Sequence, residues 1–299
     1  MRFFFITLIL SLTWTNNAEA FEIMVLSSGN ELQYTLAGKA FENYMTDYLP
    51  IRGVKSIQSV DIKFHIIEKG CERDSVAEIE RINPDLLVTI GLKALRTAVE
   101  TGKPLIFLLV SSDKINLPEK YNGTGVYLDQ GSGQEFGDVI RLLPLIKRVG
   151  VVYDPDKTGG LVAGAEKAWP RLTFIRAPVT SSKEVVTRLK DLRGNIDLLW
   201  MVPDLTAVTP QTEQSYYRFS LEQNVPVLTF SERYLERGAT IAGVFDIPAM
   251  GEKAGELAIQ VVGGLAPGSI VPVPADKRII KVNKKTADKL KIQFAEPVQ

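Results

Sequence analysis

VGVVYDP, residues 149–155, is a short run of β-branched residues that stops at Asp154-Pro155. The same event occurs near the start of the chain, where IMVLSS (23–28) stops before Gly29-Asn30. An apolar run bounded by turn residues is typical of a strand in the core of a sheet. The two stretches therefore predict the opening strand of each of two similar halves.

Both halves continue with the same order of segments. The first half has PDLLVTIGLKAL (84–95), KPLIFLLVSSD (103–113) and GTGVYLD (123–129), and the second has IDLLWMVPDL (196–205), VPVLTFSE (225–232) and ATIAGVFD (239–246). Segments with helical spacing of apolar residues lie between these strands and predict βαβ units. The predicted fold class is α/β, with two similar Rossmann-like lobes on parallel sheets, linked by a hinge, and a ligand cleft between them.

The first twenty residues have the pattern of a secretory signal peptide. Arg2 precedes an apolar core at 3–12, and Ala18-Glu19-Ala20 has the form of a cleavage site. The core of about ten residues is short for a bilayer span, which needs about 20, so a retained anchor is the weaker alternative. We expect an exported, periplasmic protein, without a lipid-anchor cysteine near the cleavage site. The predicted domains are signal peptide 1–20, lobe I at 21–126 plus 247–268, and lobe II at 127–246 plus 269–299.

Composition argues against several classes of function. The 35 basic and 35 acidic residues balance, whereas a nucleic-acid partner usually needs a basic field. The single cysteine, Cys71, cannot form an intrachain disulfide, and the single histidine, His65, lies within a predicted strand. One cysteine and one histidine also fall short of the usual zinc ligand set. We predict no cofactor, no metal, no catalytic residues and no enzyme activity; hydrolysis by a carboxylate pair remains an alternative.

The predicted ligand site lies in the loops after the strands, because open α/β sheets bind ligands outside the carboxyl ends of their strands. These loops combine acids, hydroxyls and aromatic rings, which suits an ammonium group on an apolar or aromatic body, such as an amino acid. Each acid also fits a helix N-cap. The candidate ligand-binding residues are Ser27, Ser28, Asn30, Tyr34, Gly91, Lys93, Ser111, Ser112, Tyr127, Asp129, Tyr153, Asp204, Glu232, Phe245 and Asp246.

Four stretches of the second half carry a family resemblance: RVGVVYDP (148–155), IDLLWMVPDLTAV (196–208), NVPVLTFSERYLERGATIAGVFDIPAMGEKAGELA (224–258) and RIIKVNKKTADKLKI (278–292). With them the chain resembles the ABC transporter substrate-binding proteins of the group that includes tryptophan- and phenylalanine-binding members, which have the type I periplasmic-binding fold. The resemblance implies that the helix near 250–263 returns to the first lobe and that the terminal strand belongs to the second. It also implies ligand loops after the first strand and at 91–93, 111–112, 203–204 and 245–246.

The resemblance has two departures. The loop after the first strand lacks the longer acidic or aromatic, proline-containing segment of many family members, and Tyr34 is its nearest aromatic residue. Lys93 stands where a small residue is usual, and either takes an anionic group or points to solvent.

The expected function is that of a monomeric solute-binding protein of an ABC importer. It would bind a small organic ligand by hinge closure and present it to a permease in the inner membrane. The alternative is a ligand-sensing or protein-partner module of the cell envelope that uses the same fold without transport. We expect replacement of Asp204 or Asp246 by alanine to weaken ligand binding without unfolding the protein.

Overall fold

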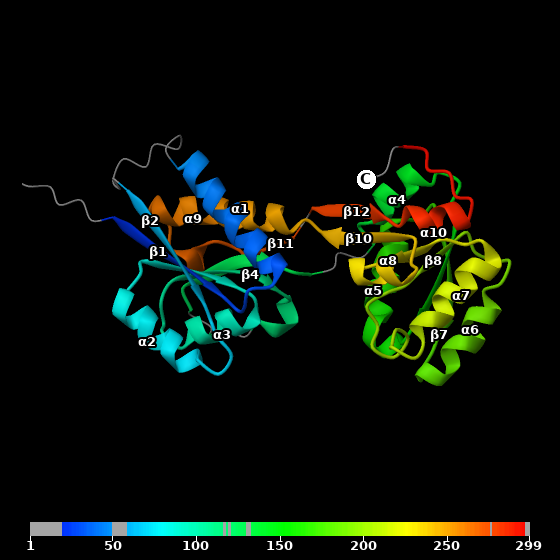
Figure 1. Ribbon diagram of the computed structural model, residues 1–299, viewed down its shortest axis with the longest axis horizontal. Helices are drawn as coiled ribbons and strands as arrows, with labels where there is room; N and C mark the ends of the chain where they lie inside the picture. The colour runs from blue at the N-terminus through cyan, green and yellow to red at the C-terminus, as the bar shows by residue number, and fades with distance from the viewer. Residues whose placement is uncertain are drawn as a thin grey trace, which may run out of the picture. The chain divides into compact units, whose positions relative to one another are not determined.

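The structure is a computed structural model that describes residues 20–49, 59–115, 118, 121–129, 133–275 and 277–296 (Figure 1). The predicted signal peptide lies outside the described residues, apart from Ala20. Within the described ranges no helix is both long and apolar enough to cross a membrane.

Five strands of the first half of the chain, together with β11 from near its end, form a six-stranded sheet in the order β11-β5-β4-β3-β1-β2. Its strands are β1 (Phe21–Ser27), β2 (Val60–Ile66), β3 (Leu86–Ile90), β4 (Leu105–Val110), β5 (Gly123–Tyr127) and β11 (Val273–Pro274). Every residue of β3 and β4 is buried, as expected of central strands that are covered on both faces.

Helices cover both faces of this sheet. In Figure 1, α1 lies with α9 on one side, and α2 and α3 lie on the other. Their bounds are α1 (Leu32–Tyr48), α2 (Glu72–Ile82), α3 (Leu92–Val99) and α9 (Ile247–Val262), with short 3₁₀ turns η1 (Ser112–Lys114) and η3 (Pro267–Ser269).

The second sheet repeats the strand order of the first, as β12-β10-β9-β8-β6-β7. Its strands are β6 (Arg148–Tyr153), β7 (Thr173–Pro178), β8 (Leu198–Trp200), β9 (Val227–Thr229), β10 (Ile241–Phe245) and β12 (Arg278–Val282). The pairs that join β7 to β10 are parallel, and β12 adds to β10 antiparallel. The α/β prediction with two similar sheets is confirmed.

Side chains of the second sheet alternate between two apolar layers. Val151 belongs to one layer with Phe136 of α4, while Val152 belongs to the other with Leu189 of α6. This period of two is the signature of strands with both faces buried. The helices of this half are α4 (Phe136–Leu142), α5 (Pro155–Ala168), α6 (Val185–Asp191), α7 (Glu213–Gln223), α8 (Glu232–Arg237) and α10 (Lys284–Lys289), with the 3₁₀ turn η2 (Ser182–Glu184).

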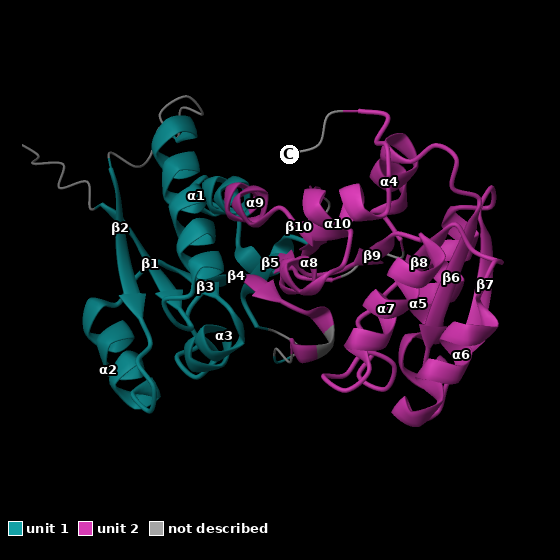
Figure 2. Ribbon diagram, turned by 45° about the vertical axis from the view of Figure 1, so that its right-hand side comes forward, with its two compact units in different colours: residues 1–107, 117–125, 254–271 teal, residues 108–116, 126–253, 272–299 magenta. Residues whose placement is uncertain are grey.

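The chain divides into two compact units (Figure 2). Unit 1 takes residues 1–107, 117–125 and 254–271, and unit 2 takes 108–116, 126–253 and 272–299. The chain changes unit within β4, again between η1 and β5, within β5, within α9 and shortly before β11. Lobe bounds and a hinge between lobes stay predictions.

The apolar spacing of the sequence predicts one helix that begins at Leu161 and another that begins at Met250. In the structure both helices begin earlier. α5 begins at Pro155 instead of Leu161, because Asp154 Oδ1 accepts a hydrogen bond from the Asp156 N–H at 3.1 Å and proline fits the first helical position. α9 begins at Ile247 instead of Met250, where Asp246 Oδ1 accepts from the Ala249 N–H at 3.0 Å.

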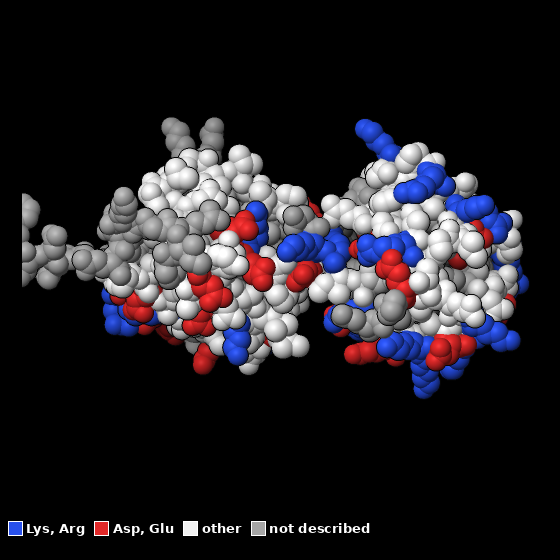
Figure 3. Space-filling model, turned by 90° about the horizontal axis from the view of Figure 1, so that it is seen from above, with Lys and Arg blue, Asp and Glu red and all other residues white. Residues whose placement is uncertain are grey.

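Charges of both signs mix over the surface of each unit, as the view from above shows (Figure 3). This distribution agrees with the equal numbers of basic and acidic residues. A single-sign field of the kind that steers nucleic acids is not seen on this face.

Candidate functional site

The loops after β1 and β3 meet in unit 1. The Ser28 N–H donates to the Ile90 carbonyl at 2.9 Å, and the Ser28 hydroxyl accepts from the Ala94 N–H at 2.9 Å. Ser28 therefore caps α3, whose own N-cap residue is the side-chain-free Gly91. Three predicted residues meet here, because a Cβ on Gly91 would lie 2.6 Å from Ser28 Oγ and 3.2 Å from Tyr34 Cζ.

Three further predicted residues of unit 1 lie around this point. Ser27 is buried, and its hydroxyl donates to the Gly29 carbonyl at 2.6 Å, which fixes the turn after β1. Asn30 is exposed in the same loop. Lys93 donates from Nζ to the Ile67 carbonyl at 3.1 Å, so the ammonium group secures the end of β2. Neither of the two alternatives for Lys93, an anionic group or solvent, foresaw this contact.

A small apolar cavity lies beside this loop cluster. It has a volume of about 240 Å³ and is lined mainly by Tyr34, Gly38, Phe64, Ile66 and Ile90. Sites for small ligands usually occupy about 300–1,000 Å³. The cavity is therefore large enough for one apolar or aromatic group but too small for a whole drug-sized ligand.

In unit 2, the loops after β6 and β8 are joined by a buried carboxylate. Asp204 is 2% exposed. Its Oδ2 accepts from the Asp154 N–H at 2.7 Å and the Thr158 hydroxyl at 2.6 Å, and its Oδ1 accepts from the Thr206 and Ala207 N–H groups, both at 2.8 Å. The Thr206 hydroxyl in turn donates to Asp154 at 2.7 Å and holds the pKa of that carboxyl below its usual range. We call these residues the Asp154–Asp204 network.

The structure bears on two sequence-based expectations for these loops. Four donors occupy Asp204, so we now expect its replacement by alanine to cost stability; a ligand role for Asp204 stays a prediction. The loop presents Leu205 instead, which is 84% exposed. Tyr153 is only 5% exposed and packs in the core layer of α4 and α5, although the sequence placed it as a wall of the ligand site.

Four predicted residues of unit 2 gather around one arginine that the sequence analysis missed. Asp129 Oδ1 accepts from the Ser111 hydroxyl at 3.2 Å and the Ser112 N–H at 2.8 Å. The Asp129 carbonyl accepts from Arg278 Nη2 at 3.1 Å, and the Arg278 guanidinium lies 3.4 Å from the ring centroid of Phe245. We call Ser111, Ser112, Asp129, Phe245 and Arg278 the Arg278 cluster.

The backbone next to this cluster is strained. Leu109 has φ +57°, a value that is rare for a bulky residue, and it lies in β4 just before Ser111. Such outliers persist only where the surroundings enforce them, and they concentrate at functional sites.

Arg278 was missed because its place depends on a long-range pairing. β12 runs antiparallel to β10, and their register sets Arg278 opposite Phe245. A basic residue at the start of a terminal strand gives no such signal by itself, although it begins the family-like ending of the chain.

A partly buried acid, Glu135, lies within the electrostatic reach of Arg278. Burial raises the pKa of Glu135, and this effect is only partly offset by the Arg278 charge and by the Trp200 indole, which donates to Glu135 Oε1 at 3.1 Å. Burial likewise lowers the pKa of Arg278, against the influence of Glu135. Glu135 was also absent from the predicted site, because its burial follows from the packing of α4 on the sheet.

The remaining predicted residues have structural contacts of their own. Asp246 caps α9, and Glu232 pairs with Lys281 at 2.7 Å. Tyr127 ends β5, where its carbonyl accepts from the Ala275 N–H at 2.9 Å. Thus Asp129, Asp154, Asp204, Glu232 and Asp246 all cap, bridge or pair within unit 2. This leaves little support for hydrolysis by a pair of these carboxylates.

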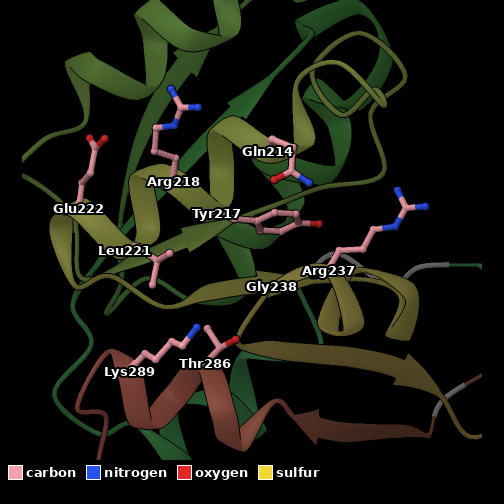
Figure 4. A pocket seen from close by; sticks show the side chains of 9 residues that line it. All are labelled: Gln214, Tyr217, Arg218, Leu221, Glu222, Arg237, Gly238, Thr286 and Lys289. Carbon is pink, nitrogen blue, oxygen red and sulfur yellow. The ribbon is translucent and has the colours of Figure 1, made fainter.

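A larger polar hollow of about 440 Å³ lies elsewhere in unit 2, among α7, α8 and α10 (Figure 4). It is near Gly238, which precedes β10, and near Thr286, which follows β12. Because β12 is antiparallel to β10, both positions lie at the amino end of β10, away from Phe245 and Arg278. The hollow contains none of the predicted ligand residues.

Comparison with known proteins gives one curated relative and several structures of the same fold. The chain is 28% identical over 178 residues to a tyrosine-binding protein of Clostridioides difficile; the match covers 58% of this chain and 50% of that protein. The chain thus spans about half the length of the curated relative it matches.

Two solved structures show the same fold. One is a ligand-free, open substrate-binding protein with adhesive properties from Clostridium difficile (TM-score 0.69, 18% identity, 93% of this chain and 96% of that one). The other is a Streptococcus ABC domain in complex with L-Trp (TM-score 0.53, 20% identity, 93% and 96%). The family model described as ABC transporter substrate binding protein matches residues 42–299. The chain therefore belongs to the ABC transporter substrate-binding protein family.

Proposed function

We propose that this protein is the exported solute-binding protein of an ABC importer and that it binds a small organic ligand, an amino acid or a related amine. The ligand would bind between the strand-end loops of the two lobes, which close on it about their hinge. The closed form would then deliver the ligand to a permease in the inner membrane. On this proposal the protein is a periplasmic monomer with no enzyme activity.

The repeated strand order carries the proposal. Both units have the same doubly wound arrangement, and each gathers hydroxyl, aromatic or charged side chains at the carboxyl ends of its strands. That edge is where open α/β sheets bind their ligands. Membership of a substrate-binding family agrees with a ligand site assembled from both halves.

An aromatic amino acid is the ligand class that the neighbours favour. One relative is named for tyrosine binding, and one structure of the same fold holds L-Trp. The small apolar cavity beside Tyr34 has a suitable size for a ring, while the strand-end hydroxyls and Arg278 supply polar partners.

Native mass spectrometry of the protein purified gently from periplasm tests this proposal. A retained small molecule, released on denaturation and identified by its mass, is the expected result. Genes for a permease and an ATPase beside this gene would support uptake. A protein that is never exported, or that retains nothing and binds no amino acid, would contradict the proposal.

Ligand sensing or binding of a protein partner, without transport, is a second candidate. The observation in its favour is the structural similarity to a substrate-binding protein with adhesive properties. A deletion strain separates the two functions, because an importer component is required for uptake of its radiolabelled ligand. Normal uptake together with lost adhesion or signalling would favour the second candidate.

A further inference from the structure

Arg278 lies at the ligand-binding edge of its sheet. Its position opposite Phe245 places it at the carboxyl end of β10, and the other parallel strands β6, β8 and β9 also end at that edge. Ligands of open α/β sheets bind at this edge. A cation here is thus in a position to meet a ligand.

Two contacts hold the guanidinium in place before any ligand arrives. The Phe245 ring lies 3.4 Å from the guanidinium carbon, and the Asp129 carbonyl takes one Nη2 hydrogen. Asp129 is fixed in turn by the Ser112 N–H and the Ser111 hydroxyl. A planar group that is already stacked and anchored loses little conformational freedom when it binds an anion.

Most of the hydrogen-bonding capacity of Arg278 is unused. A guanidinium has five N–H donors. Among the described residues, the Asp129 carbonyl is the one hydrogen-bond acceptor that Arg278 has, and no described carboxylate forms an ion pair with it. Its Nε–H is buried and has no hydrogen-bond partner among the same described residues. An unpaired, half-buried cation needs an explanation, because such donors are rarely left unsatisfied.

The nearby acids do not neutralise this cation by direct contact. The Asp129 carboxylate is taken by Ser111 and Ser112, and the Asp246 carboxylate caps α9. Glu135 acts on Arg278 only through its field, and burial disfavours the charged form of Glu135. The local environment therefore favours an additional anion.

We propose that Arg278 binds the carboxylate of the ligand and makes the protein selective for amino acids over the corresponding amines. The inference rests on the proposed function and specifies its ligand class. Guanidinium and carboxylate groups match in plane and charge, and their hydrogen bonds are among the stronger ones in proteins. Phe245 and Asp129 act as positioning residues, since they hold the guanidinium.

This assignment changes the charge argument drawn from the sequence. The acid-rich loops predicted recognition of an ammonium group. The loop acids of unit 2, however, have structural partners: Asp129, Asp154, Asp204, Glu232 and Asp246. Within the Arg278 cluster, the side chain with unused hydrogen-bond donors is Arg278. The carboxylate end of an amino acid is therefore assigned to Arg278.

The test compares acids with amines that share one body. Isothermal titration calorimetry would measure L-tyrosine against tyramine, and L-tryptophan against tryptamine, with the wild-type protein and Arg278→Gln. We expect the wild-type protein to bind at least one amino acid about 10- to 100-fold more tightly than its amine. Arg278→Gln should lose most of that preference while amine binding changes less than about threefold.

Two further variants keep the test interpretable. Arg171→Gln is the matched control, because Arg171 also lies over an aromatic ring, Trp169, at 5.9 Å, but is exposed; this variant should keep the wild-type preference. Arg278→Lys retains the charge without the planar fork. It should retain part of the preference, and it serves for the measurement if Arg278→Gln unfolds.

The failures of the two proposals differ. If the wild-type protein binds acid and amine equally, or if both Arg278 variants keep the full preference, Arg278 does not bind the carboxylate, while the solute-binding function stands. If the wild-type protein binds none of the four compounds, both the carboxylate assignment and the aromatic amino-acid proposal are contradicted.

Discussion

At the scale of single residues, the carboxylates of the strand-end loops form hydrogen bonds that hold the loops and helix ends in place. Asp204 accepts four hydrogen bonds, and Asp154 and Asp246 each cap a helix. The sequence shows only that an acid follows a strand, a pattern shared by caps and ligand residues. The caps at Asp154 and Asp246 use donors two or three residues away, whereas the link between Asp204 and the Asp154 N–H spans 50 residues of the chain.

Asp204→Ala should destabilise unit 2. The substitution leaves two backbone N–H groups of its own loop, the Asp154 N–H and the Thr158 hydroxyl without their acceptor. An unsatisfied buried group costs about 1–3 kcal/mol, so we expect a loss of roughly 2–5 kcal/mol in urea unfolding after partial hydration. Asp191→Ala is the control: Asp191 is exposed and pairs only with Arg188, so its loss should stay under about 1 kcal/mol. Equal midpoints for both variants would show that the Asp154–Asp204 network is not structural.

Glu135→Gln should raise the stability of the protein at pH 7. Because burial raises the pKa of Glu135, the folded state binds this proton more tightly than the unfolded state. Folding stability from this group is therefore greatest below the unfolded pKa of about 4.3 and is lost as the pH rises through the folded pKa. The glutamine amide does not ionise and can still accept the hydrogen bond from Trp200. The advantage of the variant in folding stability over the wild type should therefore decrease as the pH falls from 7 to 4. Urea melts at both pH values, with exposed Glu222→Gln as the control, measure it. A variant less stable than wild type at pH 7 would contradict the reasoning.

At the scale of elements, much of the fold could be predicted from apolar spacing and turn residues. Apolar spacing and turn residues predict helices at 213–223 and 232–237 and a strand at 278–282, and these are the bounds of α7, α8 and β12. The two sheets also share one strand order. The first residues of helices were predicted less well. The Gly159-Gly160 pair is unfavourable within a helix, so the sequence pattern did not indicate the first turn of α5, which depends on the Asp154 cap and Pro155. The meeting of Ser28 with Gly91 follows from the rule for strand ends. The place of Arg278 does not follow from it, since it needs the antiparallel register of β12.

Gly91→Ala and Gly160→Ala should have opposite effects. Gly91 has φ +87°, and an added Cβ would lie 2.6 Å from the Ser28 hydroxyl that caps α3. Backbone strain and a weakened cap should cost roughly 2–4 kcal/mol. Gly160 lies in α5 with open space around its Cβ direction, so alanine should stabilise by about 0.5–1 kcal/mol. Thermal unfolding of the two variants measures both effects. A Gly91→Ala variant as stable as the wild type would show that the contact between Ser28 and Gly91 tolerates an added Cβ.

At the scale of the whole molecule, two units of like topology account for the family assignment and for the proposed function. The family match includes both halves, and each unit contributes its own strand-end cluster. A ligand that contacts both units should stabilise the protein as a whole, because it binds the folded state alone.

Thermal unfolding in the presence of single amino acids tests the central claim most directly. A ligand at about 100 times its dissociation constant adds about 2.7 kcal/mol, which for a protein of this size raises Tm by roughly 5–10 °C. We predict a rise of this size with an aromatic amino acid and a much smaller one with its amine. A melting temperature unchanged by every amino acid in a broad set would contradict the account.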